Sequence, residues 1–298
     1  MPDGSDVAYV YDGSFEGWLT AVFDAYDMGQ HPVQVAEEEN LQIRFDTSVR
    51  LIVTDEPHAE RVRTGLIRRL GSEVYEKIWL AFLSCLPNRG TELYEYVRLG
   101  FSLGTKGRTV VDHLTDEHVI AVDTMSRRVG REAHLLKGFV RFNEMEGGVY
   151  YAVITPDNHV LPVIMPHFVD RFGYTMPFII HDKTRGIAGL YGGKSWYLTA
   201  AHDLTLPDLG ADEAHYMALW KRFYDAIGIK ERENPRCKRN LCPEKFWPNM
   251  LEMKPDIKTA SVARGANSIR GANSVQVANA VCLDTASETR LSVTRQEK

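Results

Sequence analysis

Apolar residues recur along the chain with two different spacings, and the spacing changes near residue 139. Before that position they recur mainly every three or four residues, which is the period of a helix with one buried face. After it many of them alternate with polar residues, as in strands with one buried face. The change predicts an α+β protein with a helical N-terminal half, an antiparallel sheet of about five strands, and a C-terminal helix that closes the fold.

Turn and capping residues set the limits of the expected elements. Helices are expected at residues 15–26, 55–70, 73–85, 91–102, 116–137, 161–172 and 211–227. Strands are expected at 7–11, within 42–53, and at 139–145, 149–155, 178–181, 186–191 and 195–199. The links between the later strands are short, as in Glu146-Gly147-Gly148, and short links favour antiparallel pairing.

Aromatic residues occur at helical spacing on several of these helices, which is typical of a packed core. We interpret those between residues 73 and 102 as core rather than as platforms for stacked bases. They are Trp79, Phe82, Tyr94, Tyr96 and Phe101. The helix at 211–227 is also expected to bury one face, formed by Tyr216, Leu219, Trp220, Phe223, Tyr224 and Ile227.

The first strand, a turn at Asp12-Gly13 and a helix capped by Ser14 predict a β-turn-α unit. Such a unit can hold an anion at the helix N-terminus. A single glycine provides no cradle, however, and Asp12 and Glu16 repel a phosphate, so we interpret the unit as structural. The acidic segment 34–40 is expected to be exposed, and Thr54 is expected to cap the next helix.

The length and composition indicate a globular protein with a sizeable core. The chain has 298 residues, of which 44% are hydrophobic, and it contains no apolar run of the roughly 18 residues that span a bilayer. The N-terminus lacks the basic start and apolar stretch of a signal peptide. We therefore expect a cytoplasmic protein without a membrane partner.

One α+β domain is expected over residues 1–254, with a candidate subdivision near residue 138. Beyond it the composition changes, and the sequence RGANS at 264–268 returns at 270–274. Small polar residues without a packing face do not compensate the entropy lost on ordering, so residues 255–298 are expected to form a disordered low-complexity tail.

Charge is distributed unevenly along the chain. Residues 1–60 carry thirteen acidic side chains and two arginines, a net charge of −11, which leaves +6 on the other 238 residues. The stretch 127–142 contains four arginines, a lysine and a histidine beside a single Glu132, and the stretch 221–245 contains eight basic and four acidic residues. These two stretches are the candidates for binding an anionic partner.

The first stretch is expected to run from a helix end into a strand. Gly138 is expected at the position where glycine terminates a helix, and Arg141 is expected to project from the strand that follows. Arginines presented by a helix end and a neighbouring strand suit a phosphate backbone. The residues proposed to contact nucleic acid are Arg127, Arg128, Arg131, His134, Arg141, Lys221, Arg222, Arg236 and Lys245. Their proximity is an assumption at this point.

Two less specific interpretations remain open for the basic stretch. Arg128 and Glu132 are four residues apart and can form a surface ion pair, so the stretch can simply be a solvated helix face. His134 is a weak candidate for proton transfer, and a packed role is the more common one for a lone histidine. His167 has the same standing.

Motifs that would name a reaction are absent from the sequence. There is no HExxH, GxSxG, P-loop, GxGxxG or zinc-deaminase pattern. The four cysteines are irregularly spaced, Cys237-x4-Cys242 lacks the spacing and the second pair of a zinc site, and no CxxxCxxC triplet is present. We therefore expect neither a metal nor a cofactor.

Several runs resemble a bacterial family described as probable DNA metabolism proteins. They are YVYDGSFEGWLTAVF (9–23), VGREAH (129–134), GFVRF (138–142), PHF (166–168) and NPR (234–236), and in this order they cover about residues 7–250. The resemblance implies a partner, a predicted radical-SAM protein for DNA modification or repair encoded nearby. Many members continue into a uracil-DNA-glycosylase-like domain. This chain lacks its GExPG motif, so glycosylase activity is not expected.

Three hypotheses of function result. In the first, an accessory protein of DNA metabolism or repair binds nucleic acid, or docks the radical-SAM partner, through the basic helix-strand surface. In the second, an enzyme acts on a nucleotide or modified base through His134. In the third, a scaffold holds the partner without contacting DNA.

Overall fold

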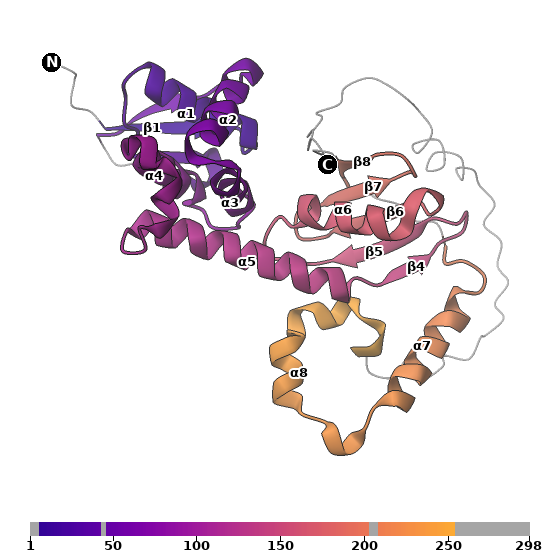
Figure 1. Ribbon diagram of the computed structural model, residues 1–298. Coiled ribbons are helices and arrows are strands. Elements are labelled where there is room, and N and C mark those ends of the chain that lie inside the picture. The colour runs from indigo at the N-terminus through magenta and orange to yellow at the C-terminus, as the bar shows by residue number, and fades with distance from the viewer. Residues whose placement is uncertain (1–5, 43–45, 203–207, 254–298) are drawn as a thin grey trace. The chain divides into compact units, whose positions relative to one another are not determined.

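The chain folds as two compact units in the computed structural model, which describes residues 6–42, 46–202 and 208–253 (Figure 1). Of the described residues, those up to 134 and those at 157–160 form the N-terminal unit, and those at 135–156 and from 161 to 253 form the C-terminal unit. The boundary between residues 134 and 135 falls within one helix. The tail expected at 255–298 lies outside the described residues.

The N-terminal unit begins with a β-turn-α unit and continues mainly as helices. Its strands are β1 (Val7–Tyr11), β2 (Gln34–Glu37) and β3 (Ser48–Leu51). Its α-helices are α1 (Phe15–Asp27), α2 (Glu56–Leu70), α3 (Ser72–Phe82), α4 (Arg89–Ser102) and the first part of α5 (Glu117–Phe139). Two 3-10 segments, η1 (Glu38–Asn40) and η2 (Gly104–Asp112), complete it.

The three strands form a parallel sheet in the order β2-β1-β3. β1 is the central strand and is buried from Ala8 to Tyr11. The acidic segment 34–40, expected to be exposed, instead begins with β2, where Val35 and Ala36 are fully buried against β1. The prediction is confirmed for Glu38 and Glu39, which are exposed, and wrong for Val35 and Ala36, because two apolar residues form too short a pattern and pairing with a strand 26 residues away decides the structure.

Hydrogen bonds close the turn between β1 and α1. Ser14 caps α1 by accepting from the Gly17 amide at 2.9 Å, as predicted. The Asp12 carboxylate accepts from the Ser14 amide at 2.9 Å and from the Thr54 hydroxyl at 2.8 Å. Thr54 therefore joins the segment that follows β3 to this turn. The predicted cap of α2 is wrong by one residue, because Asp55 and not Thr54 accepts from the His58 amide.

Aromatic residues dominate the core of the N-terminal unit. Trp18, Tyr94 and Tyr96 are at most 1% exposed, and the Trp18 indole donates to the Gly90 carbonyl at 3.0 Å. A Cβ at position 90 would lie 2.3 Å from the Val35 carbonyl oxygen, so only glycine allows α4 to approach β2 this closely. Of the five aromatic residues predicted as core, Phe82, Tyr94 and Tyr96 are buried, and Trp79 and Phe101 pack against that core partly buried.

Helix α5 shows the predicted apolar face. Its residues at three- and four-residue spacing are all at most 3% exposed: Val122, Met125, Val129, Ala133 and Leu136. The predicted helix end at Gly138 is wrong, because α5 continues to Phe139 and the Val140 amide still donates to the Leu136 carbonyl at 3.0 Å. The Arg141 guanidinium donates to the Gly138 and Val140 carbonyls, which supplies the termination that a glycine was expected to provide.

The C-terminal unit contains a five-stranded sheet, the end of α5 and the remaining helices. Its strands are β4 (Phe142–Glu144), β5 (Tyr150–Ile154), β6 (Phe178–Asp182), β7 (Ile187–Tyr191) and β8 (Trp196–Ala200). Its helices are α6 (Leu161–Phe172), α7 (Glu213–Ile227) and α8 (Pro235–Leu241), with 3-10 segments η3 (Gly173–Thr175), η4 (Lys230–Arg232), η5 (Glu244–Asn249) and η6 (Leu251–Met253).

The sheet has the strand order β4-β5-β6-β7-β8 and is mostly antiparallel, as predicted. The exception is the β5–β6 pair, which is parallel. The connection between these two strands contains α6, and a helical crossover returns the chain to the end of the sheet where it started. Between β4 and β5, the Gly148 amide donates to the Met145 carbonyl at 3.0 Å, and Gly147 and Gly148 both have positive φ, at 91° and 77°, which glycine adopts without strain.

Aromatic rings fill the space between the sheet and α6. Phe142 and Phe178 from the strands meet Phe168 and Phe172 of α6 with ring centroids 4.8 to 6.4 Å apart, and Tyr191 packs on Phe178 at 5.2 Å. These spacings are those of favourable edge and tilted aromatic contacts. The predicted α+β class is therefore confirmed, with a mixed rather than wholly antiparallel sheet.

Helix α7 differs from its prediction. None of its residues is buried by the part of the chain that the structure describes, and Tyr216, Phe223 and Ile227 are more than half exposed. The Trp220 indole of α7 donates a hydrogen bond to the Glu252 side chain of η6 at 3.2 Å. The apolar spacing predicted the helix correctly, but the spacing alone does not determine whether another element covers that face. None of the described helices has the length and apolar content that crossing a bilayer requires.

Candidate nucleic-acid interface

The predicted nucleic-acid contacts divide between the two units. Four of them lie on α5 in the N-terminal unit: Arg127, Arg128, Arg131 and His134. The other five lie in the C-terminal unit: Arg141, Lys221, Arg222, Arg236 and Lys245. The geometry of each group can therefore be described within its own unit.

The four α5 side chains are all exposed, while the opposite face of the helix is buried. The Arg127 Nε atom lies 2.8 Å from Asp123 Oδ2, four residues earlier on the helix. Among the described residues, Arg128 and Arg131 form no ion pair with a carboxylate. The charges of Arg128 and Arg131 are therefore less neutralised than the charge of Arg127. On this helix face, these two guanidinium groups are expected to attract an external phosphate most strongly.

Asp123 connects the basic face to α3. Lys77 of α3 donates to Asp123 Oδ1 at 2.8 Å. The hydrogen bond from Lys77 holds the pKa of the Asp123 carboxyl below its ordinary value, and the charges of Lys77 and Arg127 act in the same direction against the effect of burial. Arg127 is therefore neutralised in part by a carboxylate that stays ionised.

Glu132 does not lie on the exposed basic face. It is 5% exposed, and its carboxylate accepts hydrogen bonds from the Asp157 amide at 3.0 Å and from the Asn158 amide at 2.8 Å. The Asn158 side chain donates a further bond at 2.7 Å. The expected surface pair between Arg128 and Glu132 is thus replaced by an internal anchor, which holds residues 157–160 against α5.

Arg141 is occupied inside the C-terminal unit. Its guanidinium lies 2.6 Å from Glu252 Oε1, and the Glu252 side chain is only 2% exposed. Burial raises the pKa of Glu252, but the hydrogen bonds and charge of Arg141, with the Trp220 bond, bring it below its ordinary value. Arg141 also lies 5.8 Å above the Trp220 ring. The prediction had placed it in an open phosphate site, whereas the structure commits it to joining β4, η6 and α7.

The remaining cations of the C-terminal unit lie on three different segments. Lys221 and Arg222 belong to α7, Arg236 belongs to α8, and Lys245 belongs to η5. Arg222, Arg236 and Lys245 are exposed, and Lys221 is half-buried. The Lys245 ammonium lies 5.0 Å from the centre of the Phe246 ring.

The two histidines considered for catalysis, His134 and His167, differ in their surroundings. His134 is exposed and has no hydrogen-bonding or ion-pairing partner among the described residues. Burial lowers the pKa of His167, and the nearby charges of Lys137 and Arg171 lower it further. Within residues 6–42, 46–202 and 208–253, no group of three or more His, Cys, Asp or Glu side chains is placed to hold a metal ion.

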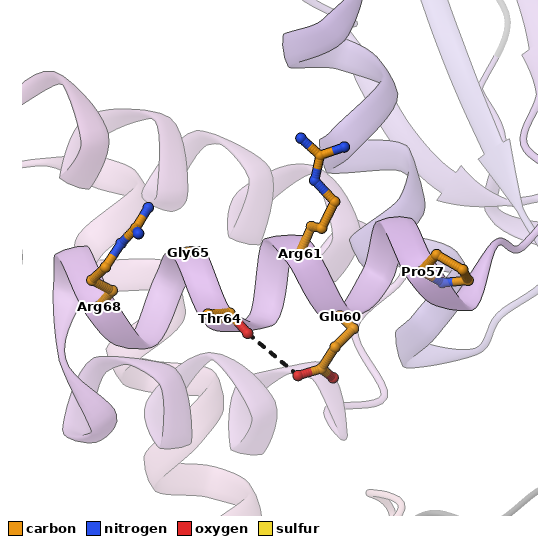
Figure 2. A pocket seen from close by; sticks show the side chains of 6 residues that line it. All are labelled: Pro57, Glu60, Arg61, Thr64, Gly65 and Arg68. Carbon is orange, nitrogen blue, oxygen red and sulfur yellow. Dashed lines mark hydrogen bonds between the residues drawn. The ribbon is translucent and has the colours of Figure 1, made fainter.

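The sequence interpretation missed a second group of arginines, on α2. A hollow along this helix is lined by Arg61, Gly65 and Arg68 and also by Glu60, whose side chain points to the other side of the helix from the two arginines in Figure 2. Glu60 is bound by Arg63 at 3.0 Å and by the Thr64 hydroxyl at 3.3 Å. A signal was present in the sequence, because positions 61–69 contain four arginines in nine residues.

Comparison with known proteins places the chain in a family. A family model described as a domain of unknown function (DUF4130) matches residues 87–252, which is more than half of the chain. The protein belongs to this family. The DUF4130 region extends from the residues before α4 to η6, and it includes all nine residues predicted to contact nucleic acid. Helix α2 lies before it.

Comparisons with individual proteins add little to this assignment. No curated protein matches the chain. Among solved structures, a DHH domain described as a member of the s1p family of ribosomal proteins aligns with 11% sequence identity and a TM-score of 0.24. The alignment covers 63% of this chain and 73% of that one. We base no conclusion on this likeness.

Proposed function

We propose that this DUF4130 protein is an accessory protein of DNA metabolism or repair that binds nucleic acid through the basic face of α5. The observation that carries the proposal is the division of this helix into two faces. One face is buried, and the other presents Arg128 and Arg131 to solvent without a carboxylate partner among the described residues. A rigid helix with unpaired guanidinium groups suits the regularly spaced phosphates of nucleic acid.

The resemblance to the DNA metabolism family supports the choice of ligand. Two of the runs that carry it, VGREAH and GFVRF, lie at or next to the end of α5. The proposal includes the radical-SAM protein as a partner and a cytoplasmic location, where bacterial DNA is found. His134 is retained as a contact residue rather than as a catalyst, because its imidazole has no partner among the described residues that would orient it for proton transfer.

Fluorescence anisotropy tests the proposal. Binding of labelled single-stranded and double-stranded DNA is measured over a series of salt concentrations, with the wild type and with the double variant Arg128→Gln, Arg131→Gln. The wild type is expected to bind at low salt and to weaken as salt increases, because binding releases counterions from the DNA. The double variant is expected to bind both forms more weakly.

A matched control removes two charges elsewhere. Lys183→Gln with Lys194→Gln changes two exposed lysines in the links of the C-terminal sheet. This variant is expected to keep nearly full affinity. Absence of wild-type binding at low salt, or equal losses in the two double variants, would reject a specific contribution of α5.

A second candidate function is docking of a partner protein, and the exposed apolar face of α7 favours it. Tyr216, Phe223 and Ile227 form part of a stripe at helical spacing, and such stripes are a common way for a helix to enter a partner's groove. Co-purification with the radical-SAM protein, repeated with Phe223→Ser, tests this function. Retention of the partner by the variant would argue against α7 as the docking element.

A further inference from the structure

Two stacks of cationic and aromatic side chains border a hollow on the N-terminal unit. In one stack the Arg61 guanidinium lies 5.1 Å from the centre of the Phe23 ring, which stacks on the His58 imidazole at 3.9 Å. In the other the Arg69 guanidinium lies 5.5 Å from the centre of the Phe101 ring, which meets Tyr26 edge-on at 5.5 Å. The hollow between α1 and α2, which we call the α2 groove, is lined by Phe23, Tyr26, Arg61, Arg68, Arg69 and Phe101.

The guanidinium groups of the α2 groove are not neutralised by carboxylates in the described part of the chain. Among the residues that the structure describes, no carboxylate lies within ion-pair distance of Arg61, Arg68 or Arg69. Other arginines of the same unit are paired, for example Arg63 with Glu16 and Arg89 with Glu37. Three guanidinium groups around one hollow raise the local positive potential, which favours an anionic ligand.

The centre of the α2 groove is open because α2 has a glycine there. A Cβ added to Gly65 would meet no atom within 4 Å, and the hollow has a volume of about 360 Å³. Arg61, Gly65, Arg68 and Arg69 follow the i, i+4, i+7, i+8 spacing of a single helix face. A second hollow continues along the same helix towards Thr64 and Pro57 (Figure 2).

We propose that the α2 groove binds single-stranded nucleic acid, with phosphates on Arg61 and Arg68 and a base stacked at the aromatic rim beside Tyr26. Guanidinium groups bind phosphate oxygens through several donors. Aromatic and arginine planes stack on bases of any sequence, but the base faces are accessible only when the strand is unpaired. Tyr26 is 45% exposed, which leaves its ring available to such a base.

This inference rests on the proposed function for the class of ligand and assigns a separate role to a separate surface. Helix α5 provides phosphate contacts that single and double strands share, whereas the α2 groove adds contacts that only an unpaired strand can make. Substitutions on α5 are therefore expected to weaken binding of single and double strands alike, whereas substitutions in the α2 groove are expected to weaken mainly the binding of single strands.

The sharpest test changes Gly65. Gly65→Glu introduces a carboxylate beside Arg61 and Arg68, and Gly65→Gln introduces a side chain of nearly the same volume without charge. Fluorescence anisotropy with a labelled single-stranded oligonucleotide at low salt is expected to show an affinity at least about fivefold lower for the Glu variant than for the Gln variant. Equal affinities of the two variants would overturn the charge-based site.

A second set of variants removes two arginines of the α2 groove or the tyrosine at its aromatic rim. Arg61→Gln with Arg68→Gln is expected to make the salt slope for single strands shallower by about 1.4, which corresponds to two lost phosphate contacts. Tyr26→Ala is expected to lower single-strand affinity about fivefold or more through lost stacking. Neither change is expected to weaken duplex binding comparably. Lys183→Gln with Lys194→Gln is the control for charge.

The outcomes separate the two proposals. If the α2 variants bind single strands as the wild type does while the α5 variant is weakened, the groove is rejected and the proposed function stands. If the wild type binds neither form of DNA at low salt, both are rejected. A groove variant that loses the same fraction of affinity for poly-glutamate as for single-stranded DNA would show a general cationic patch and would also overturn the inference.

Discussion

Arg141 and the α2 groove are both basic, but their surroundings give the charges opposite roles. Arg141 is held by a carboxylate that is 2% exposed, so its charge is used to stabilise the C-terminal unit. Arg61, Arg68 and Arg69 have no carboxylate partner among the described residues and border a hollow. The comparison teaches that an arginine becomes a candidate for binding through the absence of an internal partner, and not through its presence in a basic stretch of sequence.

The α5 face lies between these two extremes. Arg127 shares Asp123 with Lys77, whereas Arg128 and Arg131 are exposed and have no such partner in the described part of the chain. A single helix turn thus contains one partly neutralised arginine and one that is not. Substitutions that alter pairing and exposure separately test the comparison, beginning with the largest expected effect.

Removal of the buried carboxylate should destabilise the C-terminal unit. Glu252→Ala removes the carboxylate that accepts from Arg141 Nε and Nη2 and from the Trp220 indole, and the expected loss is about 2 kcal/mol of unfolding free energy. Urea denaturation followed by tryptophan fluorescence measures it. Glu244→Ala is the control, because that side chain is 61% exposed and lies 4.0 Å from Arg239; its effect is expected to stay within about 0.5 kcal/mol. Equal effects would contradict the structural role of Arg141.

Removal of positive charges from α5 should weaken duplex binding, and the loss should be larger for arginines without a carboxylate partner than for Arg127. Arg128→Gln with Arg131→Gln is expected to lower affinity by on the order of tenfold and to reduce the salt slope by about 1.8. Arg127→Gln is expected to reduce the slope by less than about 0.9, because Asp123 already neutralises part of this charge. Anisotropy titrations across a salt series give both slopes. A larger effect of Arg127 than of the other two together would reverse the proposed ranking.

Filling the open position on α2 should stabilise the N-terminal unit. Gly65→Ala adds a methyl group that meets no atom within 4 Å, and alanine favours a helix over glycine. The expected gain is about 0.5–1 kcal/mol of unfolding free energy, measured by urea denaturation. Gly90→Ala is expected to lower the unfolding free energy, because its Cβ would lie 2.3 Å from the Val35 carbonyl oxygen. A loss of stability at position 65 would show that the groove is less open than described.

The smallest expected effect is a dependence of stability on pH. Burial lowers the pKa of His181 below its ordinary value of 6.5, with Lys183 adding to the effect and Asp182 opposing it. Just below pH 6.5 the unfolded chain therefore binds more protons at this residue than the folded chain, and stability falls as the pH falls. The neutral ring also pairs with the Tyr151 hydroxyl at 2.8 Å. Denaturation at several pH values should show a smaller decrease for His181→Gln than for the wild type, and an unchanged decrease would exclude His181 as a source.

Much of the fold could be predicted from local patterns. The periods of apolar residues located α5, the strands of the C-terminal sheet and the glycine turn between β4 and β5, and Ser14 indicated the start of α1. The errors arose where a distant contact decides the structure. β2 depends on its pairing with β1, the parallel β5–β6 pair depends on the crossover through α6, and the exposed face of α7 depends on what the rest of the fold leaves uncovered.

The candidate site was less predictable than the fold. Its α5 arginines were recognisable from charge and helical spacing, and the α2 arginines were overlooked although they are as dense in sequence. Neither Glu252 as the partner of Arg141 nor the internal position of Glu132 has a local signal. Glu252 lies 111 residues from Arg141, and Glu132 receives its hydrogen bonds from residues 25 and 26 positions later.

By itself the sequence determined the elements, the buried face of α5 and the charged residues available for binding, because backbone preference and the spacing of apolar side chains act over a few residues. Only the tertiary structure decided which charges are paired and which face solvent. Ion pairing and burial depend on distances of a few ångströms between segments far apart in the chain. The guanidinium of Arg141 therefore became part of the fold, while Arg61 and Arg68 are exposed and have no carboxylate partner among the described residues.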